Sequence, residues 1–535
     1  MQFHSMHRPY LSQRTTVYAK NGMVATSQPL AAQAGLDMLK QGGNAIDAAI
    51  ATAAALTVLE PTSNGIGGDA FALVWTGGNL HGLNASGPAP GALDIDSVRR
   101  AGYERMPRYG WLPVTVPGAP AGWSELSRRF GKLPLTQVLE PAARYAEEGY
   151  PLTPVLAHYW EKGFRTFQDQ LQGEEFASWF RTFAPEGRAP RAGEIWRSAD
   201  HARTLRSIAE TDAASFYAGD LADKIDQFSR QHGGFLRKKD LESYRPEWVD
   251  PIHIHYRGYE VWEIPPNGQG LVALMALNIL KGMDFGERET AEAYHRQIEA
   301  IKLAFADGEA YITEREKMPC SVEDLLSEGY AEERRRQIGT SALTPTVGEP
   351  VGSGTVYLAA ADGDGNRVSF IQSNFMGFGS GLVVPGTGIS LQNRGYTFSL
   401  DPHHANVLEP GKRTYHTIIP GFLTKGGRPV GPFGVMGGYM QPQGHVQMML
   451  NTIDFGLNPQ SALDAPRWRW VEGKTVEVER GVPDMIVQEL IRRGHDIRIA
   501  TDPGGFGRGQ IIWENEHGVL AGGTEPRTDG SIAAW

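Results

Sequence analysis

The chain has 535 residues, of which 41% are hydrophobic and 21% charged. This is a globular composition, long enough to bury a large core without disulfide or metal staples. The formal net charge of −10 and the absence of a basic stretch argue against nucleic acid or an anionic membrane surface as a partner. The single cysteine, Cys320, excludes an intramolecular disulfide and a zinc site built from several thiolates.

No targeting or membrane segment is expected. Residues 1–20 contain no apolar run that could serve as a signal peptide, so we expect a cytoplasmic protein. The most apolar helical stretch, residues 45–59, contains Asp47 and is too short to span a bilayer.

The N-terminal region reads as strand, helix, helix, strand. A short strand at 24–26 is followed by a helix that Ser27 caps and that runs to Lys40. Asn44 caps a second helix with apolar residues at the 3.6-residue period. A glycine-rich loop, residues 62–69, then leads into a strand at 70–75.

The middle of the chain, roughly residues 120–345, is mostly helical in pattern. Its exception is an extended stretch at 256–264, which precedes an apolar helix that begins at Leu271. Residues 340–354 have few large apolar side chains, and we expect them to form an exposed, mobile connector.

The C-terminal region is richer in strands. Two strands, 356–361 and 367–373, flank a turn and predict a hairpin. Further short strands are expected at 381–384, 388–392 and 417–423, and a helix is expected at 443–454. This mixture predicts an α/β or α+β layered fold.

The common catalytic and metal-binding motifs are missing. There is no P-loop, no His-Glu-x-x-His and no Gly-x-Ser-x-Gly elbow. The two tight histidine groupings, His253-x-His255 and His403-His404, are expected to be structural. We therefore predict no metal site and no cofactor.

Gly354-Thr355 lies where the connector meets the predicted hairpin. A threonine there is an ordinary strand former. It becomes a nucleophile if the chain cuts itself before Thr355, because the new α-amino group can act as its general base. That amine has a pKa of about 7.7–8.0, suited to proton transfer near neutral pH.

Gly437-Gly438 follows an expected strand and precedes an expected helix. Adjacent glycines are typical of a tight turn. They also present backbone N–H groups without side-chain obstruction, which is what an oxyanion hole requires.

Several segments, taken in order, resemble the γ-glutamyltranspeptidase family of N-terminal-nucleophile hydrolases. They are Gly42–Ala49, Glu60–Asp69, Phe216–Gly219, Tyr256–Tyr259 with Pro265-Pro266, Asp364–Asn366, Gly437-Gly438 and Asp464–Arg467. The resemblance runs from about residue 20 to nearly the C-terminus. Within the family, the chain resembles glutathione hydrolase-like and oxamate amidohydrolase proenzymes.

The resemblance implies a four-layer αββα sandwich and a precursor that cleaves itself. The large subunit would be residues 1–354 and the small one 355–535, interwoven in one unit, with the cut between Gly354 and Thr355. Thr355 would be the nucleophile, and Gly437 and Gly438 the oxyanion glycines. Ser373 falls on the hydroxyl residue that supports the nucleophile, where threonine is more usual.

The glutamate-binding residues of the family match poorly. Its carboxylate-binding arginine falls in residues 84–90, which contain Ser86 and no arginine. Its paired serines fall on His416 and Thr417, and the two residues that hold the α-amino group fall on Arg394 and Thr397. The family's lid loop is reduced to Leu400–Gly411.

Replacing an ammonium site with Arg394 favours a carboxylate instead. We therefore expect a small amide substrate with a carboxylate near the scissile bond and no free amine beside it, as in oxamate amidohydrolases and cephalosporin-type acylases. Three alternatives stay open. Arg394 is a surface or structural residue; the protein is a γ-glutamyl hydrolase or transpeptidase acting on glutathione-like substrates; or it is an uncleaved, inactive binding or scaffold protein. Association of processed units into a higher oligomer is also left open.

Overall fold

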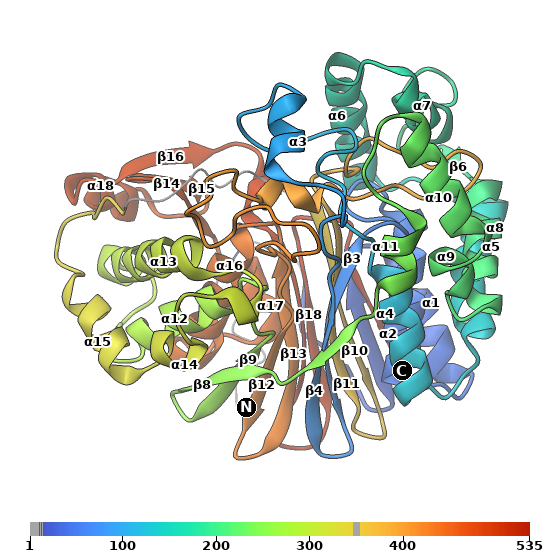
Figure 1. The fold of residues 1–535 in the computed structure, drawn as a ribbon. Helices are drawn as coiled ribbons and strands as arrows, with labels where there is room; N and C mark the ends of the chain where they lie inside the picture. Colours follow the sequence, from blue (N-terminus) through green and yellow to red (C-terminus); the bar gives the residue numbers. More distant parts are fainter. Residues whose placement is uncertain (1–9, 11, 13, 346–353) are drawn as a thin grey trace.

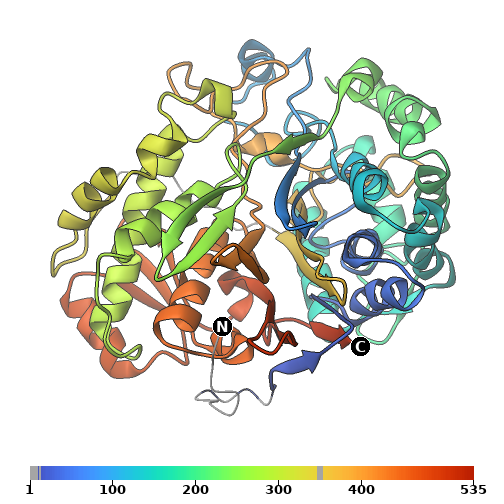
Figure 2. The same cartoon turned by 90° about the horizontal axis from the view of Figure 1, so that it is seen from below.

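Two seven-stranded sheets form the centre of the molecule, and helices cover the outer face of each (Figure 1). The structure is a computed structural model that describes residues 10, 12, 14–345 and 354–535. Seen from below, the helices of the N-terminal half lie on one side of the sheets, and those from the middle and C-terminal parts lie on the other (Figure 2). This is the four-layer αββα arrangement that the family resemblance implied.

The first sheet, here called the β10 sheet, contains the predicted hairpin at its centre. Its strands, in order across the sheet, are β19 (Ser531–Ala534), β2 (Gly22–Thr26), β10 (Gly354–Asp362), β11 (Arg367–Phe375), β3 (Asp69–Thr76), β4 (Asn79–Ala85) and β7 (Glu247–Val249). Its neighbouring strands all pair antiparallel.

The second sheet, here called the β13 sheet, packs against the inner face of the first. Its strands, in order, are β1 (Val17–Ala19), β18 (Leu520–Thr524), β17 (Arg508–Glu514), β13 (Arg428–Met436), β12 (Gly421–Lys425), β9 (Tyr259–Glu263) and β8 (Ile252–Tyr256). Buried side chains such as Phe71, Tyr357 and Phe422 fill the layer between the two sheets. Because every strand alternates its side chains, each sheet also presents an apolar outer face that a helical layer must cover.

The helices of the N-terminal half pack on the β10 sheet in one large core. They are α1 (Pro29–Lys40), α2 (Ala45–Leu59), α4 (Ala119–Phe130), α5 (Leu135–Glu148), α6 (Pro154–Gln170), α7 (Ala177–Phe183), α8 (Ala199–Glu210), α9 (Ala214–Tyr217), α10 (Asp220–Gln231) and α11 (Lys238–Ser243). Every residue of α2 is buried, and Asn44 caps it as predicted, in a capping box with Asp47.

The opposite layer covers the β13 sheet. It contains α12 (Gly270–Leu280), α13 (Ala291–Tyr311), α14 (Val322–Leu325), α15 (Glu328–Arg336), α16 (Met440–Met449), α17 (Pro459–Asp464) and α18 (Asp484–Arg492). A small sheet joins it, made of β14 (Trp468–Glu472), β15 (Thr475–Glu479) and β16 (Asp496–Ala500). Three shorter elements lie outside these layers' main helices and sheets: α3 (Ile95–Arg100), β5 (Tyr150–Pro151) and β6 (Ile195–Trp196).

The segments before and after residue 354 share both sheets. In the β10 sheet, β2, β3, β4 and β7 come before this point and β10, β11 and β19 after it. In the β13 sheet, β1, β8 and β9 come before it and the other four strands after it. A division of the chain at 354 therefore crosses both sheets and is not a domain boundary.

Several predicted elements need correction. Gln28, not Ser27, caps α1; the Ser27 hydroxyl instead contacts Glu60. The extended stretch at 256–264 is the end of β8, a turn at 257–258, and β9. The strands expected at 381–384 and 388–392 are wrong, because the described chain there forms isolated bridges, Val383 with Ser390 and Leu391 with Gly67, and no strand. The strand expected at 417–423 begins later, because β12 covers Gly421–Lys425.

The rest of the C-terminal pattern is confirmed. The hairpin forms between β10 and β11, and α16 continues to Asp454 through a π-helical turn. Residues 346–353 of the predicted connector lie outside the described residues. No helix among the described residues is both long and apolar enough to cross a membrane.

Candidate active site

Thr355 lies at the start of β10, fully buried, and its hydroxyl faces the neighbouring strand β11. Thr355 Oγ1 donates a hydrogen bond of 3.2 Å to Ser373 Oγ. Ser373 Oγ in turn donates to the carbonyl oxygen of Gly354 at 2.7 Å and accepts from the backbone N–H of Phe375, also at 2.7 Å. The structure thus joins Thr355, Ser373 and the Gly354 carbonyl in one hydrogen-bonded group.

A β-bulge aims Thr355 at this group. Gly354 is paired with Phe375 and Val356 with Gln372, so the register shifts at Thr355. The partner residue Phe375 has a φ of 74°, a left-handed conformation that is costly for a bulky side chain. Bulges of this kind re-aim a side chain and are common beside active sites.

Gly437 and Gly438 form the turn between β13 and α16. Their φ angles of 138° and 61° lie in the region that glycine adopts most easily. Neither of their N–H groups donates to another described residue, whereas the Gly438 carbonyl accepts 2.8 Å from Gln269 Nε2. Among the described residues the turn therefore presents two free N–H donors, and Gln269 binds the peptide that follows them, Gly438–Tyr439.

Gln269 was missed by the sequence analysis. Its side-chain nitrogen also donates to the Thr417 carbonyl, at 2.5 Å, and its oxygen accepts from the Tyr415 hydroxyl. The only signal in the sequence was the polar run Asn-Gly-Gln-Gly at 267–270, which separates the apolar residues before and after it in the stretch 264–280.

Arg394 is not a surface arginine, because its side chain is completely buried. Its Nη1 donates to Thr417 Oγ1 at 2.7 Å, and its guanidinium carbon lies 4.3 Å from the centre of the Phe375 ring. Its Nε and Nη2 have no partner among the described residues. Burial lowers the pKa of Arg394 only to about 10, so the side chain stays charged at neutral pH.

Asp69 is a buried carboxyl group whose protonation is coupled to the charge of Arg394. It is the residue of β3 that pairs with Ser373, and its Oδ2 is 2.9 Å from His416 Nε2. Burial raises the pKa of Asp69 to about 7, against the opposing effects of the Arg394 charge and of hydrogen bonds from Gln392 and Gly87. Burial and the Arg394 charge hold the pKa of His416 well below its usual value, so this histidine is neutral.

The remaining residues singled out from the sequence bind their neighbours. Ser86 is buried, and its hydroxyl donates to Asn84 Oδ1 at 2.6 Å. The Thr397 hydroxyl donates to the Arg394 carbonyl at 2.9 Å. In the segment 400–411, Leu400 and Leu408 pack in a small apolar cluster with residues of and around α3.

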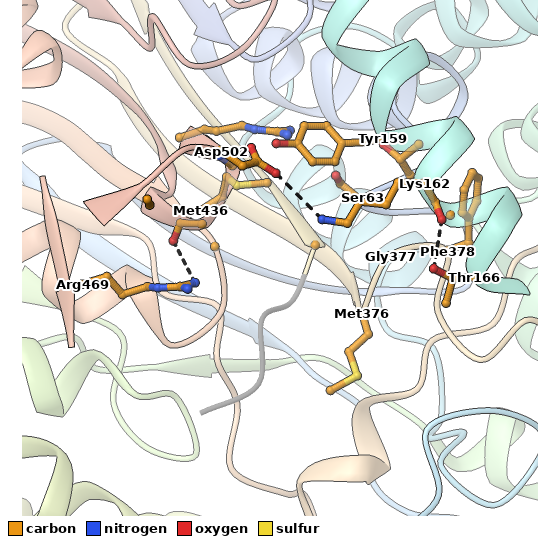
Figure 3. A pocket seen from close by; sticks show the side chains of 18 of the residues that line it. Ser63, Tyr159, Lys162, Thr166, Met376, Gly377, Phe378, Met436, Arg469 and Asp502 are labelled. Carbon is orange, nitrogen blue, oxygen red and sulfur yellow. Dashed lines mark hydrogen bonds and ion pairs between the residues drawn. The ribbon is translucent and has the colours of Figure 1, made fainter. Parts of the chain in front are cut away.

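A cavity of about 760 Å³ adjoins the site (Figure 3). Gly354 and Gly437 both line it, which places the carbonyl side of the Gly354–Thr355 bond and the glycine turn on one space. Arg394, His416 and Thr417 are not among the described residues that line it. Phe375, which pairs with Gly354, contacts the Arg394 guanidinium through its ring, so Gly354 links the Arg394 cluster to this cavity.

Histidines also meet outside this site. His253 and His255 share the exposed face of β8. The fold brings together a group that the sequence could not show, His295, Glu299 and His495, whose ligand atoms lie within 4.8 Å of one another. The Lys302 ammonium donates a hydrogen bond of 2.8 Å to Glu299. This buried network therefore holds the Lys302 side chain as its cation.

Comparisons with known proteins identify the family of this chain. The family model for gamma-glutamyltranspeptidase matches residues 31–535. The glutathione hydrolase-like YwrD proenzyme of Bacillus subtilis is 37% identical over 96% of this chain and 99% of its own. The oxamate amidohydrolase proenzyme of Klebsiella pneumoniae is 33% identical over 96% of this chain and 98% of its own.

A solved structure is closer still. The crystal structure of cephalosporin acylase from Bacillus halodurans is 66% identical, with a TM-score of 0.96, and covers 100% of this chain and 99% of its own. The match to the family model over almost the whole chain, the similarity to several proenzymes and this shared fold place the protein in the γ-glutamyltranspeptidase family of N-terminal-nucleophile enzymes.

Proposed function

We propose that this protein is a self-processing threonine amidohydrolase that cleaves a small, carboxylate-bearing amide through an acyl-enzyme. The observation that carries the proposal is the hydrogen-bonded group of Thr355, Ser373 and the Gly354 carbonyl. Ser373 polarises the carbonyl that must be attacked, while the attacking hydroxyl lies beside it. The processed protein would consist of residues 1–354 and 355–535.

The first reaction is the cut itself. Thr355 Oγ attacks the Gly354 carbonyl carbon, the C–N bond breaks and an ester forms, and the nitrogen gains the hydroxyl proton. Water then hydrolyses the ester, which leaves a carboxylate on Gly354 and a free α-amine on Thr355. The hydrogen bond from Ser373 to the carbonyl stabilises the negative charge that develops on that oxygen.

The second reaction uses the new amine as the base. It takes the Thr355 hydroxyl proton while Oγ attacks the substrate amide, and it returns the proton to the leaving amine. The free N–H groups of Gly437 and Gly438 stabilise the oxyanion. Water then attacks the acyl-enzyme ester while the Thr355 α-amine takes its proton. The acid is released, and Thr355 Oγ recovers the proton from the amine.

Arg394 supports a substrate with a carboxylate on its acyl side. A fully buried guanidinium with two unused nitrogen donors is a strong binding group for an anion, and Thr417 and the neutral His416 lie beside it. Relatives named as an oxamate amidohydrolase and a cephalosporin acylase fit this inference. Relatives named as glutathione hydrolases favour the γ-glutamyl alternative, but Arg394 would repel the free ammonium of a γ-glutamyl group.

A substrate panel separates these functions. Purified protein is incubated with oxamate, with an acyl amide that ends in a carboxylate, and with a γ-glutamyl anilide, and release of ammonia or amine is measured. We expect turnover of the first two and little of the third. Strong turnover of the γ-glutamyl anilide alone would show that the alternative is correct.

Replacing Ser373 with alanine should slow the self-cleavage by about 10- to 100-fold, since a charge-stabilising hydrogen bond of about 1.5–3 kcal/mol is lost. The rate is followed on a denaturing gel as the intact chain converts to fragments. Ser369→Ala is the matched control, because Ser369 is buried on the same strand and bonds Tyr357 instead. Ser373→Thr should restore cleavage, and equal rates for Ser373→Ala and Ser369→Ala would contradict the assignment.

The Michaelis constant for a carboxylated amide should rise as the pH increases through about 7. Below that pH Asp69 is neutral and leaves the Arg394 charge to the substrate; above it the Asp69 carboxylate competes for the same guanidinium. We expect KM to rise several-fold between pH 6 and 8, roughly 0.5–1 kcal/mol of lost attraction. Asp69→Asn should flatten this dependence, and an unchanged profile in that variant would refute it.

A further inference from the structure

Gln269 is a completely buried amide that links two separate parts of the candidate site. Its Nε2 donates hydrogen bonds to the carbonyl oxygens of Thr417, at 2.5 Å, and of Gly438, at 2.8 Å. Its Oε1 accepts a hydrogen bond of 3.0 Å from the Tyr415 hydroxyl. A side-chain amide nitrogen carries two N–H groups, so both donors of Gln269 are already in use. The side chain therefore holds the backbone around it and has no donor left for a substrate.

The backbone of Gln269 is bound on both sides of its peptide. Its N–H donates to the His416 carbonyl at 2.9 Å, and the His416 N–H donates to the Asn267 carbonyl at 2.8 Å. The Gln269 carbonyl accepts a hydrogen bond of 3.0 Å from Val272, in the first turn of α12. The amide therefore projects from a fixed point, and a shift of its side chain would break bonds in two segments at once.

The two carbonyls that Gln269 binds belong to different parts of the proposed mechanism. Thr417 accepts a hydrogen bond of 2.7 Å on its hydroxyl from Arg394 Nη1, so it belongs to the proposed carboxylate-binding group. Gly438 is the second glycine of the proposed oxyanion turn. Because both carbonyl oxygens bond one nitrogen atom, they lie within two hydrogen-bond lengths of each other. Gln269 therefore ties the carboxylate-binding group to the glycine turn.

The other bonds of the glycine turn stay within its own helix. The Gly437 carbonyl accepts from the Met440 N–H and the Gly438 carbonyl from the Gln441 N–H, both at 3.1 Å in the first turn of α16. These bonds hold the turn to α16 and leave its distance from Thr417 open. Gln269 supplies a link between the two segments.

We propose that Gln269 is a positioning residue that sets the spacing between the carboxylate-binding group and the oxyanion turn, and thereby selects the length of the acyl group. The inference rests on the proposed function and deepens it. An acyl group with its carboxylate at Arg394 and its scissile carbonyl at the glycine turn must span the distance between them. When that distance is fixed, a chain one methylene longer or shorter places its carbonyl badly, and catalysis is sensitive to such displacements.

A series of amides that differ only in acyl length tests this spacing. The mono-4-nitroanilides of oxalic, malonic, succinic, glutaric and adipic acids each keep one free carboxylate, and release of 4-nitroaniline gives kcat and KM. We expect the wild-type protein to favour one length over its neighbours by about tenfold or more in kcat/KM. Gln269→Met keeps the size of the side chain and removes both donors. In this variant the preference should fall below about threefold, mainly through a lower kcat on the favoured substrate.

Gln447→Met is the matched control. Gln447 is also a buried glutamine whose Nε2 donates to two backbone carbonyls, those of Gln443 and Trp468, but it binds neither the glycine turn nor Thr417. Its variant should keep the full length preference. Gln269→Glu should keep part of it, because burial favours the neutral carboxyl group, which retains one donor. Tyr415→Phe removes only the bond to Gln269 Oε1 and should weaken the preference less, which provides a second test if Gln269→Met does not fold.

Self-cleavage separates a positioning role from general damage to the fold. The proposed cut uses the bond from Ser373 to the Gly354 carbonyl, in which Gln269 takes no part, so Gln269→Met should be cut at close to the wild-type rate. A cut that slows together with amide turnover would make Gln269 a structural residue and overturn the inference. The same length profile in wild type and Gln269→Met, or no length preference in the wild type, would refute the inference and preserve the proposed function. No wild-type turnover of any of the anilides would instead refute the proposed function itself.

Discussion

A Thr355→Ala variant should remain one uncut chain and lose at least about 10³-fold in amidase kcat, as expected when a covalent nucleophile is removed. The methyl group that replaces the side chain cannot attack the Gly354 carbonyl, so no α-amine is released either. Cleavage and turnover therefore fail together. A denaturing gel and an amidase assay on the same sample measure both.

The wild-type chain should give fragments of about 39 and 20 kDa, estimated from ~110 Da per residue over 354 and 181 residues. Thr355→Ser keeps a hydroxyl at the same place and should still be cut, though at a different rate. Because Thr355 is small and buried at a strand end, the alanine variant should keep its fold, which circular dichroism checks. An alanine variant that is cut at the same bond would remove Thr355 from the mechanism.

Arg394→Met should lower kcat/KM for carboxylated amides by about 100-fold, because two hydrogen bonds to a charged group are lost, about 3 kcal/mol together. Turnover of a matched neutral amide should change little. The comparison of the two substrates isolates the role of the guanidinium from any effect on the nucleophile. Methionine has a similar length and suits the apolar side of the Phe375 ring.

The variant has a second expected signature. Arg394 is the main charge that holds down the pKa of Asp69, so its removal should raise that pKa further and keep Asp69 neutral to higher pH. Arg394→Lys should retain part of the preference as a single point charge. An equal loss on carboxylated and neutral amides would mean that Arg394 is a structural residue.

The sequence predicted the parts of the site that depend on local pattern. The hairpin signal around residues 362–366 placed Thr355 and Ser373 on adjacent strands, and the structure brings their hydroxyls together. The local pattern also placed Gly437-Gly438 in a strand-to-helix turn, as the structure has it, whereas their oxyanion role was implied by the family resemblance and stays a prediction. The layered fold followed from the mixture of elements and from the family resemblance.

The sequence could not show the contacts that depend on distant pairing. Gln269 binds the Gly437-Gly438 turn although 169 positions of chain separate it from Gly438, and His295 contacts His495 across 200 positions. Asp69 stood in a recognised motif, but its place beside Ser373 follows from strand register. The false strands at 381–384 and 388–392 show the opposite error, since these buried segments bond each other and Gly67 through isolated bridges without joining a sheet.

The most direct measurement is the N-terminal sequence of the smaller fragment, followed over time together with amidase activity. The proposed mechanism predicts a fragment that begins Thr355-Val356-Tyr357, with activity rising in proportion to its amount. A fully active protein whose chain is still unbroken from Met1, or a fragment that begins at another residue, would contradict it.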